Sequence, residues 1–254
     1  MPCIAVFNQK GGVAKTTSTL NLATALARAG WKAWAIDMDA QAHLSMALTG
    51  GRPPLDAADS LCAFFNQQKP LRDIARDTAL GVKLVASHAE LAKVESLFGS
   101  SSQAASALKR GLAEATPEGP VLIDCCPALG VLSLNALYAA DRVLIPVSSD
   151  YLSLQSVVRL DAAIVALEKA MKRSIEKRIV ITRFDSRRKL AQQVAQTLQD
   201  RYGDQVCKTR IRECVALAES PALGKDIFGH QRRGVGAQDY GALAYELLRT
   251  GFFN

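Results

Sequence analysis

The chain has 254 residues, of which 49% are hydrophobic and 22% are charged, and its formal net charge is +7. This composition is typical of a globular protein, and the length suffices for one substantial domain with a buried core. No apolar run approaches the roughly 18–20 residues that span a bilayer, and no positive segment precedes the short apolar run at the N-terminus, which argues against a secretory signal. We therefore expect a cytoplasmic protein.

Short apolar runs alternate with helical patterns along the chain. The apolar runs predict buried strands at 3–8, 32–37, 82–87, 120–125, 142–147 and 178–184. The helical patterns lie at 16–30, 103–115, 131–140, 151–174 and 188–202, and the segment 99–106 is typical of a loop or a helix entry. This alternation predicts an α/β fold in one domain, residues 1–254, with a mostly parallel twisted sheet and helices on both faces.

The segment FNQKGGVAKTT, residues 7–17, follows the first predicted strand and precedes the first predicted helix. In this context the backbone N–H groups of a loop and of a helix N-terminus can bind phosphate. The usual phosphate-loop pattern has glycine where this chain has Gln9 and Ala14. Lys15 is placed to reach the terminal phosphates, and the Thr16 hydroxyl to ligate Mg²⁺.

Two acidic motifs also follow predicted strands. IDMDAQ, residues 36–41, contains Asp37 and Asp39, and VLIDCCP, residues 121–127, delivers Asp124 in the manner of a Walker B acid. A strand-end aspartate alone is often only a helix cap. Three such motifs in order, each after an apolar strand, indicate a Mg²⁺-dependent nucleotide site at the carboxyl edge of the sheet.

The six cysteines and three histidines do not indicate a metal site. No C-x-x-C pair occurs, although two ligands from one turn would need that kind of spacing. Buried, reduced thiols are the expected state of these cysteines, which are Cys3, Cys62, Cys125, Cys126, Cys207 and Cys214.

Several segments resemble those of one protein family. KGGVAKTT fits the deviant Walker A pattern K-G-G-x-x-K-[ST]-T of the ParA/MinD group of P-loop ATPases. DMDAQAHLS, DCCPALGVLSLNAL, DRVLIPVSSDYLSLQSV, TRFDSRRKLAQQV and KTRIRECVALAESPALGKDI resemble successive segments of the ParA (Soj-like) partition ATPases. The resemblance covers nearly the whole chain, with weaker matching between about 51 and 118.

The resemblance implies roles for individual residues. Lys10 matches the signature lysine that crosses the interface of an ATP-bound homodimer to the partner's nucleotide. Asp39 matches the acid that orients the attacking water, Asp124 matches the Walker B acid, and Asp37 is expected to support Lys15 or the Mg²⁺ shell. The catalytic residues are thus Lys10, Lys15 and Asp39, with Thr16, Asp37 and Asp124 at the metal. The expected ATP contacts are Gly11, Gly12, Val13, Ala14, Lys15, Thr16 and Thr17 for the phosphates, and Arg183, Phe184 and Pro221 for adenine.

The net charge is concentrated between Lys169 and Arg233, where 16 Lys/Arg and 7 Asp/Glu give +9. Such a basic segment is an electrostatic footprint for polyanions. The resemblance implies non-specific binding to double-stranded DNA, in association with the nucleoid, and hydrolysis stimulated by a ParB-like or other cargo adaptor. The DNA-binding candidates are Lys172, Arg173, Arg187, Arg188, Lys189, Lys208, Arg210, Arg212, Arg232 and Arg233.

Three positions depart from the family pattern. Ala14 replaces a glycine, Ala40 replaces a proline after Asp39, and Cys126 replaces a proline after the Walker B acid. Alanine at position 14 is harmless where φ is negative, whereas a positive φ costs on the order of 1 kcal/mol or more. Slow ATP turnover is the hypothesis that follows from a strained loop.

Alternative functions remain open within the resemblance. A MinD-like spatial regulator would need a C-terminal amphipathic helix rich in Lys/Arg, whereas the tail GALAYELLRTGFFN reads as a packed helix without a stable membrane anchor. A cluster carrier would need paired cysteines, a biotin-pathway ligase would lack Lys10, and a tyrosine kinase of this superfamily would carry a tyrosine cluster. The first strand at residue 3 leads us to expect no N-terminal helix-turn-helix. The cargo could be a plasmid, a chromosome, a carboxysome or a chemoreceptor cluster.

Overall fold

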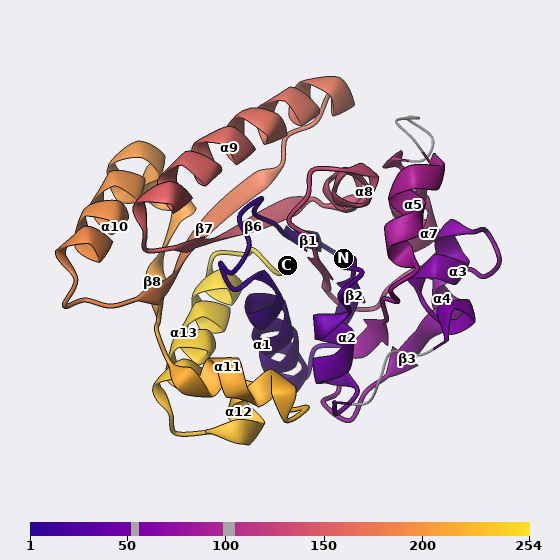
Figure 1. The fold of residues 1–254 in the computed structure, drawn as a ribbon, viewed down its shortest axis with the longest axis horizontal. Coiled ribbons are helices and arrows are strands. Elements are labelled where there is room, and N and C mark those ends of the chain that lie inside the picture. Colours follow the sequence, from indigo (N-terminus) through magenta and orange to yellow (C-terminus); the bar gives the residue numbers. More distant parts are fainter. Residues whose placement is uncertain (52–55, 99–104) are drawn as a thin grey trace.

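A computed structural model of the chain describes residues 1–51, 56–98 and 105–254. It contains one eight-stranded sheet with the strand order β3-β4-β2-β5-β1-β6-β7-β8 (Figure 1). Every neighbouring pair is parallel except β3 and β4, which are antiparallel at one edge. The strands are β1 (Cys3–Val6), β2 (Trp34–Asp37), β3 (Ala75–Asp77), β4 (Lys83–Val85), β5 (Val121–Asp124), β6 (Arg142–Ser148), β7 (Glu176–Phe184) and β8 (Val206–Arg212).

Helices cover both faces of the sheet. One face packs against α1 (Lys15–Arg28), α2 (His43–Leu48), α11 (Val215–Ala222), α12 (Ile227–His230) and α13 (Val235–Arg249). The other face carries α3 (Leu61–Phe65), α4 (Leu71–Ile74), α5 (Leu91–Phe98), α7 (Ala107–Ala115), α8 (Val131–Ala139), α9 (Tyr151–Met171) and α10 (Lys189–Tyr202). Short 3₁₀ helices occupy Ala57–Asp59 and Gly203–Gln205.

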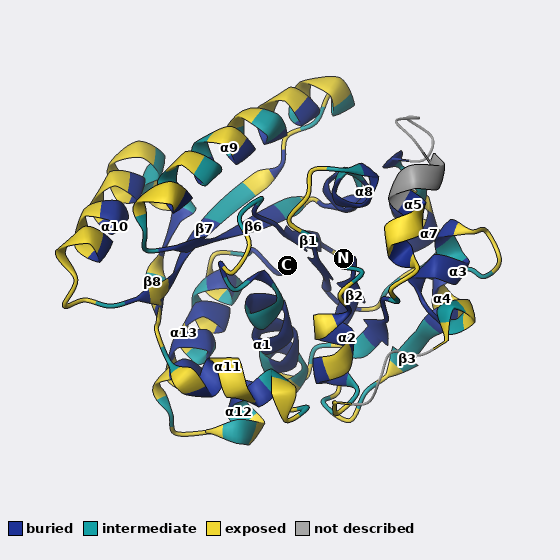
Figure 2. Cartoon of the chain, viewed as in Figure 1, coloured by how far each residue is buried: buried dark blue, intermediate teal, exposed yellow. Residues whose placement is uncertain are grey.

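The alternation of side chains along β1 explains the two cores. Cys3 and Ala5 belong to the core under α7–α10, whereas Ile4 and Val6 belong to the core under α1 and α13. Successive side chains of a strand point to opposite faces, so a strand covered on both sides must be apolar throughout. Figure 2 shows the central strands as buried along their length.

The predicted architecture is confirmed. Each predicted strand and each predicted helix corresponds to an element of the sheet or of its covering layers, and the sheet is mostly parallel. The prediction for 99–106 concerns residues that lie mostly outside the described part. The edge strands β3 and β8 were not predicted because their sequences carry no long apolar run. The helices α2, α3, α4, α5, α11 and α12 were not predicted either, since segments of four to eight residues are too short to show a clear helical period.

Two further features bear on the expected functions. In the described part of the chain, no helix is both long and apolar enough to cross a membrane. The six cysteines, all in the described part of the chain, form no disulfide; Cys126 and Cys214 are partly exposed and the other four are buried. Among the described residues, no cluster of three or more His, Cys, Asp or Glu side chains could hold a metal ion by itself.

Candidate nucleotide-binding site

The sheet order brings the three predicted motifs together. β1 lies between β5 and β6, and β2 pairs with the other side of β5. In this register Val6 is opposite Asp124, and Asp37 is also opposite Asp124. The loop after β1 and the two aspartates therefore meet at one carboxyl edge, where parallel α/β sheets bind their ligands.

The loop after β1 is held in place by side chains of neighbouring strands. Asn8 is fully buried, donates from Nδ2 to the Pro146 carbonyl at 2.8 Å, and accepts the backbone N–H of Lys10 at 3.0 Å. The Thr182 hydroxyl at the end of β7 donates to the Val13 carbonyl at 3.1 Å. Strands β6 and β7 thus fix the loop at both ends, which presets its curvature before any ligand binds.

Two loop residues have left-handed backbone conformations. Gly12 has φ 74°, and Ala14, the residue that precedes α1, has φ 68° and ψ 35°. This is the strained alternative for Ala14, because the Cβ of an L-residue clashes with the backbone in this region. Ala42, which precedes α2 beside Asp39, has φ 54° and the same disadvantage.

Lys15 begins α1 and points back over the loop. Its Nζ donates to the Lys10 carbonyl at 3.0 Å, and the residue is only 8% exposed. Burial lowers the pKa of Lys15, and the charges of Asp124 and Asp39 oppose that shift. A desolvated ammonium at a helix N-terminus is a strong binding point for phosphate.

The carboxylate of Asp124 has one oxygen that can still accept a ligand. It is 1% exposed; Thr19 Oγ1 donates to its Oδ1 at 3.4 Å, while the buried Oδ2 has no hydrogen-bond partner. Burial, followed by the nearby Asp37, raises the pKa of Asp124, and a hydrogen bond from Thr16 opposes this. An orphaned buried carboxylate oxygen is costly, and a hard cation such as Mg²⁺ at Thr16 and Asp124 would satisfy it.

Asp37 has a different environment from Asp124. Its Oδ1 accepts the N–H of Asp39 at 3.1 Å, and its Oδ2 accepts both the N–H and the hydroxyl of Ser45 at 2.8 and 2.7 Å. Burial raises the pKa of Asp37 to about 6 against these hydrogen bonds. Both of its oxygens are therefore engaged in bracing the β2–α2 turn, which carries Asp39.

Lys10 forms an intramolecular ion pair. Its Nζ contacts Asp150 Oδ1 at 2.5 Å and Ser153 Oγ at 3.0 Å. Asp150 caps α9 by accepting the Ser153 N–H at 3.1 Å, and the Lys10 pairing and hydrogen bonds from Ser148 and Ser153 lower its pKa against the effect of burial. In this single chain the Lys10 ammonium is therefore directed at the first turn of α9.

A cavity of about 660 Å³ adjoins the loop. Phosphate-loop residues, Asp39 and His43 lie on its wall, together with residues of β8, α11 and α13. The predicted residues on the wall are Gly11, Gly12, Ala14, Lys15, Thr16, Thr17, Asp39 and Arg183. Arg212, predicted to contact DNA, also lies on this wall. The wall residues that sequence reasoning missed are His43, Pro127, Thr182, Ile211, Glu213, Cys214, Val215, Leu217, Ala218 and Tyr240.

Of the three residues expected near adenine, Arg183 lies on the cavity wall and Phe184 and Pro221 do not. Arg183, at φ 51°, turns toward the cavity and pairs with Glu213 at 3.2 Å. Phe184 is 7% exposed beneath the Arg210 guanidinium, and Pro221 lies in the later part of α11, so neither lines the cavity. The segment 211–218 comprises the end of β8, the loop after it and the start of α11, so recognising that strand would have placed these residues at the same carboxyl edge.

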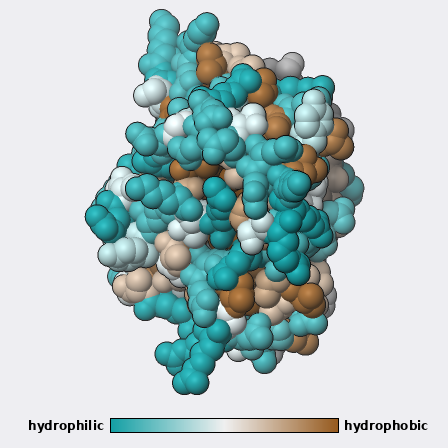
Figure 3. Space-filling view, turned by 90° about the vertical axis from the view of Figure 1, so that its left-hand side faces the viewer, coloured by the Kyte–Doolittle hydropathy of each residue, from teal (hydrophilic) through white to brown (hydrophobic). Residues whose placement is uncertain are grey.

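The basic candidates divide by whether their charge is already paired. Arg212 pairs with the nearly buried Asp239 at 2.6 Å, and Arg187 pairs with Asp185 at 2.9 Å. Arg188 lies between Asp185 and Glu213, and Arg173 lies 3.8 Å from Asp141. The exposed candidates without an ion pair in the described residues are Lys172, Lys189, Lys208, Arg210, Arg232 and Arg233. Figure 3 shows the α10 and β8 side of the molecule, which hydrophilic residues largely cover.

Comparison with known proteins places this site in a family. A family model described as an AAA domain matches residues 1–177. The chromosome partitioning protein ParA of Caulobacter vibrioides is 34% identical over 250 residues, 96% of this chain and 93% of that protein. The chromosome-partitioning ATPase Soj of Thermus thermophilus is 36% identical over 250 residues, 96% of this chain and 94% of its own length. The chain belongs to the ParA/Soj family.

Solved structures agree with this assignment. A Mycobacterium smegmatis protein described as cobyrinic acid a,c-diamide synthase, with a bound ATP analogue and magnesium, superposes with a TM-score of 0.84 at 28% identity, covering 99% of this chain and 96% of that one. Apo McdA from Cyanothece superposes with a TM-score of 0.87, covering 98% and 99%, but at 21% identity it supports the fold alone. The ParA/Soj fold of this chain is thus one that holds adenine nucleotides with magnesium in a relative.

Proposed function

We propose that this ParA/Soj-family chain is a Mg²⁺-dependent ATPase whose ATP-bound homodimer binds double-stranded DNA without sequence preference. The observation that carries the proposal is the convergence of Lys15, Thr16 and the unsatisfied Asp124 oxygen at the N-terminus of α1. A phosphate group there meets loop N–H groups, the helix dipole and a desolvated ammonium. Few other ligands would use all of these features together.

Each residue at the phosphate end has a distinct task. Thr16 and Asp124 would hold Mg²⁺, which neutralises charge on the phosphates. Lys15 stabilises the charge that develops on the terminal phosphoryl group. Asp39 orients the attacking water, while Asp37 keeps the Asp39 loop in place through its hydrogen bonds to Asp39 and Ser45.

Lys10 has a role that needs a second subunit. In the proposed dimer its ammonium leaves Asp150 and contacts the phosphates bound by the partner subunit. A charge that arrives in trans couples dimerisation to the presence of ATP, because only the triphosphate presents enough negative charge at the interface. Hydrolysis, stimulated by a ParB-like or other cargo adaptor, then returns the monomer.

DNA binding would use the unpaired basic residues. Lys208 and Arg210 are two apart on the edge strand β8 and therefore share one side of it. Arg232 and Arg233 lie exposed between α12 and α13. Contacts of this kind neutralise phosphates and carry no base information, so affinity should fall steeply with salt. The proposal places the protein in the cytoplasm on the nucleoid.

The MinD-like alternative has less support. It would need a C-terminal segment free to insert into lipid, yet Phe252 and Phe253 are fully buried against α1 and α13. Positioning of plasmids, chromosomes or large protein assemblies remains compatible with the same nucleotide cycle, and the cargo depends on the adaptor.

Retention of a labelled DNA duplex with ATP and with ADP tests the switch. We expect retention with ATP and Mg²⁺ only, and its loss in the Lys15→Ala variant. Asp39→Ala should bind ATP and DNA but fail to hydrolyse, and Lys10→Ala should fail to dimerise. If Lys15→Ala and the wild type bind DNA identically in both nucleotides, the proposal is wrong.

A further inference from the structure

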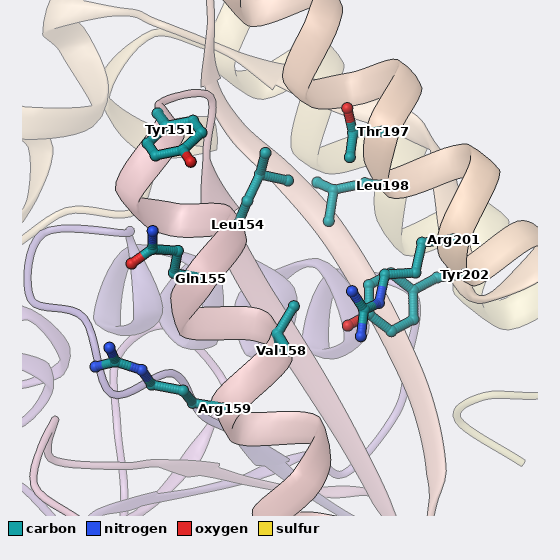
Figure 4. A pocket seen from close by; sticks show the side chains of 9 residues that line it. All are labelled: Tyr151, Leu154, Gln155, Val158, Arg159, Thr197, Leu198, Arg201 and Tyr202. Carbon is teal, nitrogen blue, oxygen red and sulfur yellow. The ribbon is translucent and has the colours of Figure 1, made fainter.

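A groove between α9 and α10 takes no part in the nucleotide chemistry. It encloses about 500 Å³, within the range of roughly 300–1,000 Å³ that is typical of specific binding pockets. Two helices supply its walls. Leu154 and Val158 point toward α10, whereas Gln155 and Arg159 extend from the other side of α9 (Figure 4). Its lining residues are Tyr151, Leu154, Gln155, Val158 and Arg159 of α9, and Thr197, Leu198, Arg201 and Tyr202 of α10.

The floor of the groove is apolar and open to a ligand. Leu154 and Val158 on α9 lie across from Leu198 and the ring of Tyr202 on α10 (Figure 4). At one end Tyr151 is 60% exposed, so its ring is available for contact with a ligand. A groove between two helices suits a third helix that inserts apolar side chains spaced three and four residues apart.

The charge beside this floor is positive and unpaired. Arg159 and Arg201 are exposed, and neither forms an ion pair with any residue that the structure describes. The Arg201 guanidinium lies over the Tyr202 ring at 5.6 Å, which orients it at the groove. Two acids of the same helices have other partners: Asp161 pairs with Lys177 at 2.8 Å, and Asp200 accepts a hydrogen bond from Gln196 at 2.6 Å.

We propose that this groove docks an amphipathic helix of a partner protein. Its apolar side chains would fill the space between Leu154 and Leu198, and its Asp or Glu residues would pair with Arg159 and Arg201. DNA phosphates could meet the arginines but would leave the apolar floor uncovered. A second copy of this chain that docked through its own basic segment, +9 between residues 169 and 233, would be repelled by the two arginines.

The position of the groove gives the docked helix a route to the nucleotide site. The first turn of α9 carries Tyr151 on the groove side, and its cap residue Asp150 holds Lys10. Identifying the occupant as the adaptor that stimulates hydrolysis rests on the proposed function. The docking itself does not, and its test therefore uses binding without nucleotide.

The probe is a phage-displayed library of peptides of about 14 residues, roughly four helical turns, selected on the nucleotide-free protein. Selected peptides are then labelled, and their affinity is measured by fluorescence anisotropy. Thr197→Trp fills the groove from an exposed position, and Gln193→Trp, one turn earlier on α10 and outside the lining, is its matched control. Arg159→Glu and Arg201→Glu test the charge, with Arg249→Glu at the end of α13 as the control.

We expect the peptides to be acidic, with apolar residues at helical spacing, and to bind at least about tenfold more weakly to Thr197→Trp and to each groove arginine variant. The two controls should bind as the wild type does. Basic peptides, equal binding to Thr197→Trp, or a library without groove-dependent binders would overturn the proposal.

Two other outcomes would assign the groove to a different occupant and so also contradict the proposal. One is a labelled DNA duplex that loses affinity in Arg159→Glu and Arg201→Glu and that competes with the selected peptides. The other is self-association in nucleotide-free light scattering that Thr197→Trp abolishes. Peptide binding that persists while ATP-dependent DNA retention fails would support the groove and contradict only the proposed nucleotide switch.

Discussion

Replacing Ala14 by glycine should relieve strain in the phosphate loop. Ala14 has φ 68° and ψ 35°, a conformation that costs alanine about 1–2 kcal/mol and that glycine adopts freely. Glycine also enlarges the conformational freedom of the unfolded chain, which offsets about 0.4–1 kcal/mol. The expected net change is a gain of roughly 0–1 kcal/mol in the free energy of unfolding of the nucleotide-free protein.

The matched control is Ala25→Gly, in the interior of α1, where the same substitution should cost about 1 kcal/mol. The two variants should differ by roughly 1–2 kcal/mol, or by about 2–4 °C in Tm for each kcal/mol in a chain of this size. Thermal and urea unfolding measure this difference. Equal destabilisation by Ala14→Gly and Ala25→Gly would refute the strain argument. If the strain also slows catalysis, Ala14→Gly should hydrolyse ATP faster, and equal turnover would remove that hypothesis.

Three further predictions concern other parts of the structure. Asp150→Ala should lower the free energy of unfolding by about 1 kcal/mol, because α9 loses its N-cap acceptor. Asp150→Asn keeps an acceptor and should lower it by less, and urea unfolding of both variants measures the difference. Arg212→Ala should destabilise the protein by roughly 1–2 kcal/mol, because the nearly buried Asp239 loses its cation. Lys208→Ala should leave Tm unchanged and weaken binding of a DNA duplex, as measured in a salt titration. Hydrogen bonding to Arg187 lowers the pKa of Asp185 to about 2, so its stabilising effect is present above pH 4 and is lost as the pH falls from 4 to 2. Asp185→Asn should therefore flatten this acid limb in a pH series of urea unfolding, and an unchanged limb would contradict the assigned cause.

The parallel sheet and the phosphate end of the site could be predicted because both depend on local patterns. A continuous apolar run marks a strand that is covered on both faces, and the residues after it must lie at the ligand edge. Two of the site residues lie at or just after such a run, namely Asp39 and Asp124. Lys15 and Thr16 lie at the start of the helix that follows the first run.

The base end of the cavity could not be predicted in the same way. The middle of β8 has three consecutive polar residues, Lys208 to Arg210, because this edge strand is partly exposed, so Val206–Arg212 carries no continuous apolar signal. The missed cavity wall follows from the missed strand. The partners of Arg212 and Lys10 are 27 and 140 residues away in sequence, and only the fold brings them together.

The backbone angles at Ala14 and Ala42 also lay beyond sequence reasoning. Sequence alone left the sign of φ at position 14 open, and both residues stand directly before a helix beside the cavity. The Thr182 hydroxyl that holds Val13, and the hydrogen bonds of Ser45 to Asp37, fix these turns from outside the loops themselves.

The ion pair with Asp150 gives the Lys10 ammonium a defined partner within the single chain, so the lysine is not simply waiting for a second subunit. One ammonium has two mutually exclusive acceptors, a carboxylate in its own chain and, in the proposed dimer, the phosphates of a neighbour. Under the proposed function, dimerisation is an exchange reaction in which Lys10 has a negatively charged partner both before and after assembly. The threshold for assembly is set by the difference between two ion pairs, so a single substitution at Asp150 could shift the ATP concentration at which the protein assembles without altering a residue that contacts the nucleotide.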